Sequence, residues 1–339
     1  MSKAELLLEA EYLRKLFTRR VLPHYPDFSA IKEIRIRPYK KLIWSETYHL
    51  VIKYSVIFLD HDGREVSLPI VATAHSNEDR ENVFLTLSYL WDHHLSDEQI
   101  RLPRPLFYDP ELRATFYRAV EGQNLLQAIK NQDWVAVEAG TRKAAVLFAK
   151  IHSLPLEGDY GFNRANGRIA TVIPGAEFVI TELGYRFSGR YQSQVKAAYE
   201  RLIAREDDFF NRTSQRWLIH GDAHPENIIL PANDKIGIID FTDFCRADFA
   251  RDLGAFGQQL EYKIATKGAD SARASELKEL FWEEYFKAAG LKLDQDLRQR
   301  IDLYYNFTIL RTAIYWLLKY DCDPVRGQNL LDSLSSDFK

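Results

Sequence analysis

The stretch LIHGDAHPENIIL, residues 218 to 230, places two histidines, two carboxylates and an amide between apolar flanks. Asp222 and Asn227 lie at the two ends of its polar part, and Asp240 ends the next β-like segment, KIGIID. If the two β-like segments pair as a hairpin, Asn227 and Asp240 come to lie at the same end of it. An amide oxygen and a carboxylate suit Mg²⁺ beside phosphate groups, and Asp222 can then orient a hydroxyl or accept its proton. These three residues predict phosphoryl transfer.

Two other interpretations of this stretch compete with the first. His220 and His224 are four residues apart, the spacing of histidine pairs that bind zinc from a helix. Gly221 and Pro225 disfavour a continuous helix there, because proline lacks the N–H donor and clashes with the preceding turn. No third histidine or cysteine stands at a matching spacing. The other alternative is a polar turn whose Asp and Asn side chains cap backbone groups, which leaves the matched position of Asp240 unexplained.

The first 121 residues have the pattern of a mixed α+β lobe. Apolar residues at helical spacing predict a helix over residues 3 to 21. Ser76, followed by acidic residues, predicts the start of a second helix. Alternating and β-branched runs predict strands over residues 31 to 38, 47 to 59, 64 to 74 and 113 to 120. The Asp-Gly pair between the second and third runs is typical of a hairpin turn.

Beyond Gly122 the pattern becomes mostly helical, so we expect one lobe over residues 1 to 121 and a larger one over residues 122 to 339. Two short β-like pieces, at 227 to 230 and 235 to 240, interrupt the helical lobe and carry the polar hairpin. Helical periodicity predicts helices near residues 123 to 131, 134 to 153, 190 to 210, 249 to 266, 271 to 289 and 295 to 319.

The composition is that of an ordinary globular protein, with 46% hydrophobic and 27% charged residues. A net charge of −3 gives no basic field for nucleic acid. Cys245 and Cys322 cannot form a disulfide framework, which fits a reducing compartment. The N-terminus lacks the pattern of a signal peptide, and no apolar run approaches the roughly 20 residues of a membrane helix. We therefore expect a cytoplasmic protein without a nucleic-acid or membrane partner. The oligomeric state stays open.

The segment HGDAHPEN, followed by IGIIDF, resembles the catalytic segment of the aminoglycoside phosphotransferase and choline kinase-like family. FAKIHSLP, DFARDLGAF and FYRAVEGQNL are similar to the family's neighbouring helices and to the hinge between its lobes. The resemblance is dense from about residue 101 to 260. It implies a two-lobed protein-kinase-like fold, with an antiparallel sheet and a helix in the small lobe and a mostly helical large lobe.

The resemblance also implies roles for particular residues. Asp222 resembles the catalytic base, while Asn227 and Asp240 resemble the two ligands of Mg²⁺. The backbone from Ala119 to Glu121 would bind the adenine of ATP. His220 and Asp252 are similar to the residues that brace the catalytic loop. The implied activity is transfer of the γ-phosphate of ATP to a hydroxyl of a small molecule.

The small lobe departs from the family pattern, which has a lysine on its third strand and a glycine-rich phosphate loop. No lysine lies between Lys53 and Lys130, Thr73 or a neighbour stands at the lysine position, and residues 37 to 49 contain no glycine. The partner glutamate of that lysine would be Glu78 or Glu81. Three accounts stay open. Lys53 reaches in, a loop cation substitutes (Arg64, Lys40 or Lys41), or the phosphates are held mainly by metal and the nucleotide binds weakly or differently.

The missing lysine supports an alternative function, a pseudokinase that binds a nucleotide or metabolite without turnover. The resemblance would suggest a cationic acceptor, and the acids Asp243, Asp248 and Glu261 near the motif would suit one. A sugar, an amino alcohol or a nucleoside is equally compatible with the sequence, because fold likeness does not determine the substrate.

Overall fold

The computed structural model describes residues 3–44, 46–158, 160–232 and 234–338. The chain forms two compact units. The first, called the sheet unit here, comprises the chain up to Gly122 together with Gly158–Phe162 and Ile229–Thr242. The second, called the helical unit, comprises Gln123–Glu157, Asn163–Ile228 and Asp243–Lys339. The segment that contains Asp240 therefore packs with the sheet unit, whereas Asp222 and Asn227 belong to the helical unit.

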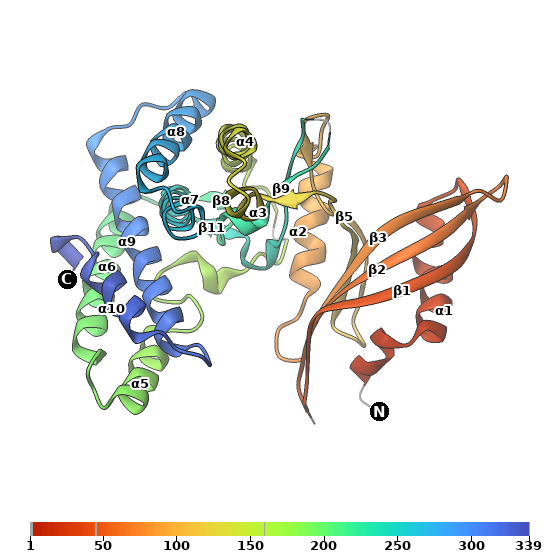
Figure 1. Cartoon of the computed structure of the whole chain (residues 1–339), viewed down its shortest axis with the longest axis horizontal. Helices are drawn as coiled ribbons and strands as arrows, with labels where there is room; N and C mark the ends of the chain where they lie inside the picture. Colours follow the sequence, from red (N-terminus) through yellow and green to blue (C-terminus); the bar gives the residue numbers. More distant parts are fainter. Residues whose placement is uncertain (1–2, 45, 159, 233, 339) are drawn as a thin grey trace. The chain divides into compact units, whose positions relative to one another are not determined.

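A five-stranded antiparallel sheet forms the centre of the sheet unit, in the order β1-β2-β3-β6-β5. Figure 1 shows its first three strands side by side, with helix α1 (Ala10–Arg20) along them. The strands are β1 (Phe28–Ile43), β2 (Tyr48–Asp60), β3 (Glu65–His75), β5 (Arg104–Asp109) and β6 (Ala114–Arg118). All four strands expected from the sequence are confirmed, while β5 was not anticipated.

The two faces of this sheet have different roles, because side chains alternate along each strand. One face carries Leu50, Ile52 and Tyr54, which pack with Phe17 of α1 into one apolar core. A 3₁₀ helix at Lys3–Leu8 precedes α1, so the single helix predicted over residues 3 to 21 is divided into two. The opposite face carries the side chains of the intervening residues in each strand. This second face contributes residues to the candidate site.

Helix α2 (Glu81–Asp92) begins later than the sequence predicted. Ser76 does not cap it. Its hydroxyl instead accepts a hydrogen bond from the N–H of Tyr48 at 3.1 Å, which ties the segment before the helix to β2. The residue before the helix is Arg80, which makes no side-chain cap. The expected role of Ser76 is therefore wrong, since a strand amide competes for its oxygen.

Two strands from the distant segment 229–242 complete the sheet unit. β10 (Ile236–Ile238) pairs in parallel with β4 (Ile100–Arg101), and β9 (Ile228–Leu230) lies next to β10 in the same sheet. The predicted hairpin of β9 and β10 is thus confirmed. Gly122 ends the first segment at φ 150°, where a Cβ atom would stand 2.5 Å from the carbonyl oxygen of Leu230, so the close approach requires glycine.

The helical unit contains the six helices that the periodicity predicted and two, α5 and α10, that it did not. Asp or Asn caps several of them by accepting from the third backbone N–H of the helix, as Asp270 and Asp294 do. The helices are α3 (Leu125–Lys130), α4 (Trp134–His152), α5 (Ala176–Phe187), α6 (Gln192–Arg212), α7 (Ala250–Lys263), α8 (Ser271–Ala289), α9 (Gln295–Leu318) and α10 (Pro324–Asp332). None of the helices in the described part of the chain offers a stretch long and apolar enough to span a membrane.

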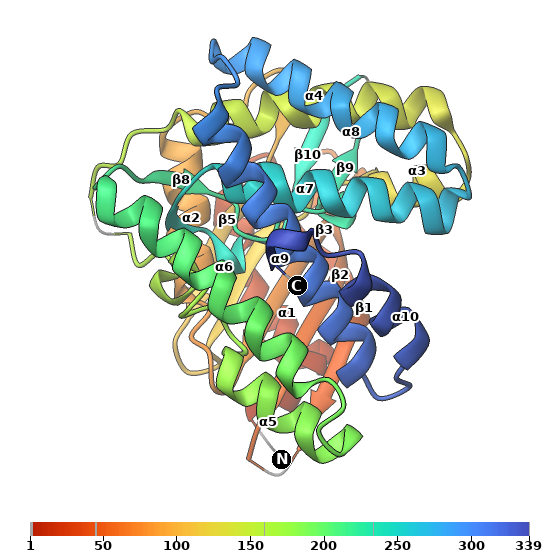
Figure 2. The same ribbon diagram turned by 90° about the vertical axis from the view of Figure 1, so that its left-hand side faces the viewer.

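Close helix packing organises this unit, with α4 against α8 and α7 against α9 (Figure 2). Gly254 lies where α7 meets α9, and a Cβ there would stand 2.6 Å from the backbone nitrogen of Tyr305. The short antiparallel strands β8 (Trp217–Ile219) and β11 (Cys245–Ala247) frame the polar loop that follows β8. The α+β class expected from the sequence is confirmed.

Candidate active site

The loop after β8 holds Asp222 in a fixed backbone conformation. Gly221 adopts φ 80°, and a Cβ atom at this position would lie 2.2 Å from the carbonyl oxygen of Asp243. A side chain is therefore excluded there both by conformation and by space. Residues 220 to 224 form no helix, so His220 and His224 do not share a helical face. The glycine lets the chain turn sharply and present the next side chain, Asp222, at the loop surface.

Asp252, in the first turn of α7, holds the loop in place. Its fully buried carboxylate accepts hydrogen bonds from the backbone N–H groups of His220 at 2.7 Å and Gly221 at 2.9 Å. His152 Nε2 lies 3.1 Å from the same carboxylate, and its Nδ1 lies 2.9 Å from the hydroxyl of Tyr285. Burial alone would raise the pKa of Asp252, but the contacts with His152 and the loop outweigh it and lower that pKa. The Asp252 carboxylate therefore stays ionised.

A string of alternating charges begins at Asp222. Its Oδ2 lies 3.2 Å from His224 Nε2, His224 Nδ1 lies 3.0 Å from Glu226 Oε2, and Lys263 Nζ donates to Glu226 Oε1 at 2.6 Å. Burial opposes charge on His224, yet the two carboxylates raise its pKa to about 10. Burial would likewise raise the pKa of Asp222, but the hydrogen bond and charge of His224 outweigh burial and lower that pKa well below the ordinary value. Asp222 is therefore an ionised acceptor with fixed orientation.

Asn227 is buried and turns its amide toward the loop. Its Nδ2 donates to the backbone oxygen of Asp222 at 2.9 Å, which leaves the amide oxygen as the free end of the side chain among the described residues. In the sheet unit, Asp240 is exposed at φ 65° and accepts a hydrogen bond from the hydroxyl of Thr242 at 2.9 Å. Each of these two residues thus keeps an oxygen of the kind that Mg²⁺ binds.

The face of the sheet opposite α1 shows what stands at the position of the missing lysine. Thr73 is buried on β3, opposite Val51 and Thr115 on the neighbouring strands. Lys53 lies on the same face, two residues from Val51 along β2. Arg64 precedes β3 at its far end, roughly 30 Å from Thr73 at about 3.3 Å per residue, and is excluded as a substitute.

Arg80 is a buried cation beside this position, 5% exposed. Its backbone oxygen accepts a hydrogen bond from the hydroxyl of Thr115, the residue opposite Thr73. Its side chain contacts exposed Glu78 at 3.0 Å, and its Nε has no hydrogen-bond partner within the described ranges of the chain. Burial and the charge of Asp240 raise the pKa of Tyr117, and the charge of Arg80 opposes them, so Arg80 and Asp240 both lie near this ring.

The predicted hinge residues, Ala119 and Glu121, line a cavity of about 590 Å³ in the sheet unit. The N–H of Ala119 is already used, since it donates to the backbone oxygen of Pro69 at 2.9 Å. An adenine bound at this segment would thus meet the carbonyl of Ala119 or the backbone of the two residues that follow it.

A second cavity, of about 350 Å³, opens at Asp222 within the helical unit. One wall comes from α7 and the other from α9, each contributing side chains at helical spacing. The residues from α7 are Arg251, Ala255, Gln259, Tyr262 and Lys263, and those from α9 are Phe307, Thr308, Arg311, Thr312, Tyr315 and Trp316. Because the carboxylate of Asp222 lies in its lining, this cavity is the candidate acceptor site.

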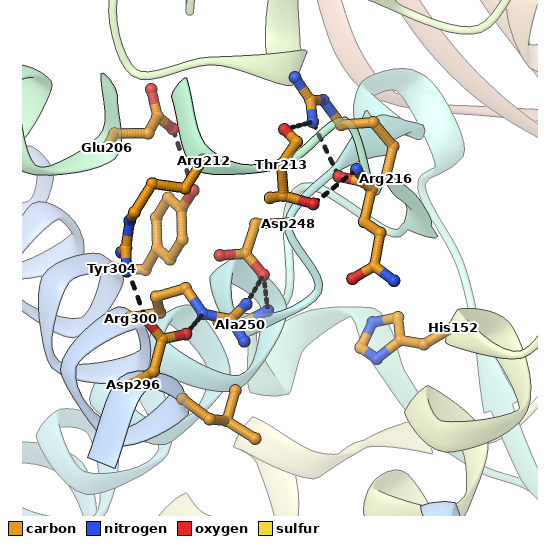
Figure 3. Close-up of polar contacts among 12 residues, drawn as sticks. His152, Glu206, Arg212, Thr213, Arg216, Asp248, Ala250, Asp296, Arg300 and Tyr304 are labelled. Atoms are coloured by element: carbon orange, nitrogen blue, oxygen red, sulfur yellow. Dashed lines mark hydrogen bonds and ion pairs between the residues drawn. The ribbon is translucent and has the colours of Figure 1, made fainter. Parts of the chain in front are cut away.

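The three acids expected to attract a cationic acceptor are engaged elsewhere. Figure 3 shows Asp248 bonded to Arg300 and to the backbone of Ala250; the ion pair measures 2.6 Å and the carboxylate is fully buried. Glu261 binds Lys278 at 3.1 Å, and Asp243 accepts from the side chain of Asn163 at 3.1 Å. None of the three lines the cavity at Asp222.

Sequence reasoning missed Lys263, Arg251 and Arg311. Glu226 and His224 lie inside the quoted motif, where alternating charge is visible by inspection. The three cations lie on distant helices. Arg311 stands between Phe307 and Tyr315 at a spacing of four and has no signal of this kind, whereas Arg251 and Lys263 belong with Gln259 to a largely polar repeat at every fourth position of α7. Such a repeat is also the pattern of any solvated helix face.

A sequence profile described as the phosphotransferase enzyme family matches residues 55 to 290. Among solved structures, the ethanolamine kinase of Plasmodium vivax is 14% identical, with 99% of this chain and 88% of that chain covered and a TM-score of 0.58. The ternary complex of APH(2″)-IIa with streptomycin and ATP is 14% identical over 97% and 98% of the two chains, with a TM-score of 0.54.

A third similar structure is spectinomycin phosphotransferase APH(9)-Ia with ADP and spectinomycin. It is 12% identical over 97% of this chain and 95% of that chain, with a TM-score of 0.55. No curated protein matches the chain. At these identities the similarity shows the fold, which confirms the kinase-like fold expected from the sequence.

Proposed function

Because the chain belongs to the phosphotransferase enzyme family, we propose that it transfers the γ-phosphoryl group of ATP to a hydroxyl of a small molecule. The observation that carries this proposal is the ionised, oriented carboxylate of Asp222 in the lining of a 350 Å³ cavity. A hydroxyl bound in that cavity donates a hydrogen bond to Asp222 and is thereby aligned for attack. Since its pKa is low, Asp222 takes the proton late, when the oxygen has begun to bond to phosphorus.

We propose Mg²⁺ as the cofactor, because Asn227 and Asp240 each offer an oxygen of the kind that this ion prefers. The amide oxygen of Asn227 and the carboxylate of Asp240 would hold it, and bound Mg²⁺ supplies positive charge to the triphosphate. The hydrogen bond from Asn227 Nδ2 to the loop backbone orients the amide so that its oxygen is the end available to the ion. Asp252 and His152 act indirectly, because they hold the loop that carries Asp222.

Arg80 takes the place of the missing small-lobe lysine in this proposal. It supplies a buried guanidinium whose Nε has no partner among the described residues. Its backbone oxygen meets Thr115, the residue opposite Thr73, and its charge acts on Tyr117 together with that of Asp240. Lys53 serves as the matched control, since it lies on the same face but is only partly buried. A charge-assisted contact to phosphate contributes about 1.5–3 kcal/mol, so its loss should raise the KM for ATP about 10- to 100-fold.

The test is ADP release from ATP and Mg²⁺ in the presence of hydroxylated metabolites. We expect acceptor-dependent turnover in the wild type, loss of about 10²-fold or more in Asp222→Asn, and a raised KM for ATP in Arg80→Met but not in Lys53→Met. Turnover that survives in Asp222→Asn would contradict the proposal.

A pseudokinase is the second candidate, favoured by Thr73 at the lysine position and by the absence of glycine between residues 37 and 49. Ligand binding to the native state raises the unfolding temperature by linkage. If ATP with Mg²⁺ stabilises the protein and no acceptor is phosphorylated, the pseudokinase is correct. If ATP with Mg²⁺ gives no stabilisation at all, both functions are excluded.

A further inference from the structure

The charges that line the cavity at Asp222 do not cancel. The carboxylates in its lining are Asp222 and Glu226, and Lys263 forms an ion pair with Glu226 at 2.6 Å. Two further cations line the same cavity, Arg251 and Arg311. The cavity therefore carries a surplus of positive charge.

Neither arginine has a carboxylate partner among the described residues. Arg251 is 3% exposed and donates to the backbone and side-chain oxygens of Asn166, both of them neutral, the latter at 2.7 Å. Arg311 is half-buried, and its guanidinium carbon lies 5.9 Å from the ring centre of Phe307. Arg251 interacts with the charge of Glu206 and Arg311 with that of Asp222, but neither guanidinium contacts a carboxylate directly in the described part of the chain. Burying a guanidinium without such a contact is unfavourable, so the pair favours an anion.

Arg311 is the better placed of the two for a ligand. Its charge helps to lower the pKa of Asp222, which places it within electrostatic reach of the proposed base. Its guanidinium keeps all of its donors, because it donates no hydrogen bond within the described part of the chain. Arg251 uses donors on Asn166 and contributes mainly its charge. A planar guanidinium with free donors matches a carboxylate or phosphate in two-point contact.

The remaining walls suit a ligand with an apolar or planar part. Phe307, Tyr315 and Trp316 follow one another on the cavity face of α9, and Tyr262 faces them from α7. Of the acids that would attract a cationic acceptor, Asp248 and Glu261 are paired with Arg300 and Lys278, Asp243 accepts from the amide of Asn163, and none of the three lines this cavity.

We propose that the acceptor is a hydroxylated anion, whose carboxylate or phosphate group binds Arg311 in the field of Arg251 while its hydroxyl meets Asp222. This inference rests on the proposed function. In the reaction the acceptor oxygen forms a bond to the γ-phosphorus, the bond from that phosphorus to the bridging oxygen breaks, and ADP leaves with the electron pair. The hydroxyl proton passes to Asp222. Amino alcohols are disfavoured, since their ammonium group would meet the two arginines.

The experiment compares three acceptor classes at equal hydroxyl content: hydroxy acids and sugar phosphates, neutral polyols, and amino alcohols. Each class is assayed for ADP release and, without ATP, for the shift in unfolding temperature. The variants are Arg311→Gln, Arg311→Lys and the matched control Arg298→Gln, which changes an exposed arginine on the same helix. The carboxylate and phosphate members within the first class distinguish the two sources of the anionic group.

We expect anionic compounds to be the preferred acceptors and to stabilise the wild type. In Arg311→Gln their KM should rise about 10- to 100-fold while kcat stays within about threefold, with partial recovery in Arg311→Lys and no change in Arg298→Gln. A preference for neutral or cationic acceptors overturns the inference. An equal loss of kcat for all classes in Arg311→Gln also overturns it, because it assigns Arg311 to the transferring phosphoryl group.

The two proposals fail in different ways. If no class releases ADP but anionic compounds still stabilise the protein in an Arg311-dependent manner, phosphoryl transfer is wrong and the anion site stands. If only amino alcohols release ADP, phosphoryl transfer stands and the anion site is wrong. If anionic compounds give neither turnover nor stabilisation, the anion site is rejected.

Discussion

His224 is the residue whose role the structure changes most. Its two ring nitrogens face Asp222 and Glu226 at 3.2 and 3.0 Å, so it is an ion-paired group between two carboxylates. Because the pKa of His224 rises to about 10, the stability that it contributes is fully present below its ordinary pKa of 6.5 and is lost as the pH rises through about 10. The lowered pKa of Asp222 has the opposite sign, and its contribution is lost only in strong acid.

Replacing His224 by Gln should move the acid limb of the kcat profile to higher pH. Burial would then raise the pKa of Asp222 with little opposition, toward or above the ordinary value of 3.8. In the wild type we expect no loss of activity from Asp222 ionisation above about pH 4. The measurements are kcat and the unfolding temperature as functions of pH, with exposed His61→Gln as the control. Superimposable profiles for His224→Gln and the wild type would rule out this coupling.

At the scale of elements, the packing of α7 on α9 decides whether the candidate acceptor cavity exists. The two helices form opposite walls of the cavity, and Gly254 permits their close approach, since a Cβ there would stand 2.6 Å from the backbone nitrogen of Tyr305 and 2.7 Å from the backbone oxygen of Ile301. Both obstacles are backbone atoms, which cannot rotate away. The cavity therefore depends on a residue that carries no functional group.

Gly254→Ala should separate α7 from α9 and lower the free energy of unfolding by about 1–3 kcal/mol, the usual cost of overpacking. It should also raise the KM for the acceptor more than that for ATP, because Lys263 and Arg311 come from the two separated helices. Chemical denaturation and steady-state kinetics measure these effects. Gly175→Ala is the matched control, since no atom lies within 4 Å of its added Cβ. Equal effects of the two substitutions would show that the close approach is unimportant.

At the scale of the whole molecule, the sheet unit is assembled from segments far apart in the chain. β4 pairs with β10, with Ile100 opposite Ile236, and Asn82 on α2 donates to the backbone oxygen of Thr242 at 3.1 Å. Asp240, the proposed metal ligand, therefore belongs to the unit that holds the hinge residues. Sequence order alone assigned it to the other lobe.

A fragment of residues 1–122 should consequently be less structured than the same segment in the full chain. We expect rapid amide exchange in α2 and β4, because their partners in residues 229–242 are missing. Hydrogen exchange read by mass spectrometry measures this. Appending residues 229–242 through a flexible linker should restore protection, whereas a scrambled segment of the same composition should not. Full protection in the bare fragment would mean that the first segment folds alone.

Much of this protein follows from local sequence. Alternation and Asp-Gly predicted the long strands and their hairpin, and periodicity predicted six of the helices, because both depend on neighbouring residues. Asp222, Asn227 and Asp240 were found because they cluster in one short motif. The sequence did not predict α5, β5 or the cap before α2, where Tyr48 competes for the oxygen of Ser76.

Only the tertiary structure decided which groups meet at the loop. Lys263 reaches Glu226 across 37 residues, and Arg251 and Arg311 arrive from two helices whose sequences indicate a polar face but no partner. It also decided that Asp248 and Glu261, acidic and close to the motif, are neutralised by Arg300 and Lys278. The physical reason is that charge pairing and burial depend on distances through space, which helical and strand periods do not specify. The sequence determined the chemistry of the loop, and the fold determined the charge of the cavity beside it.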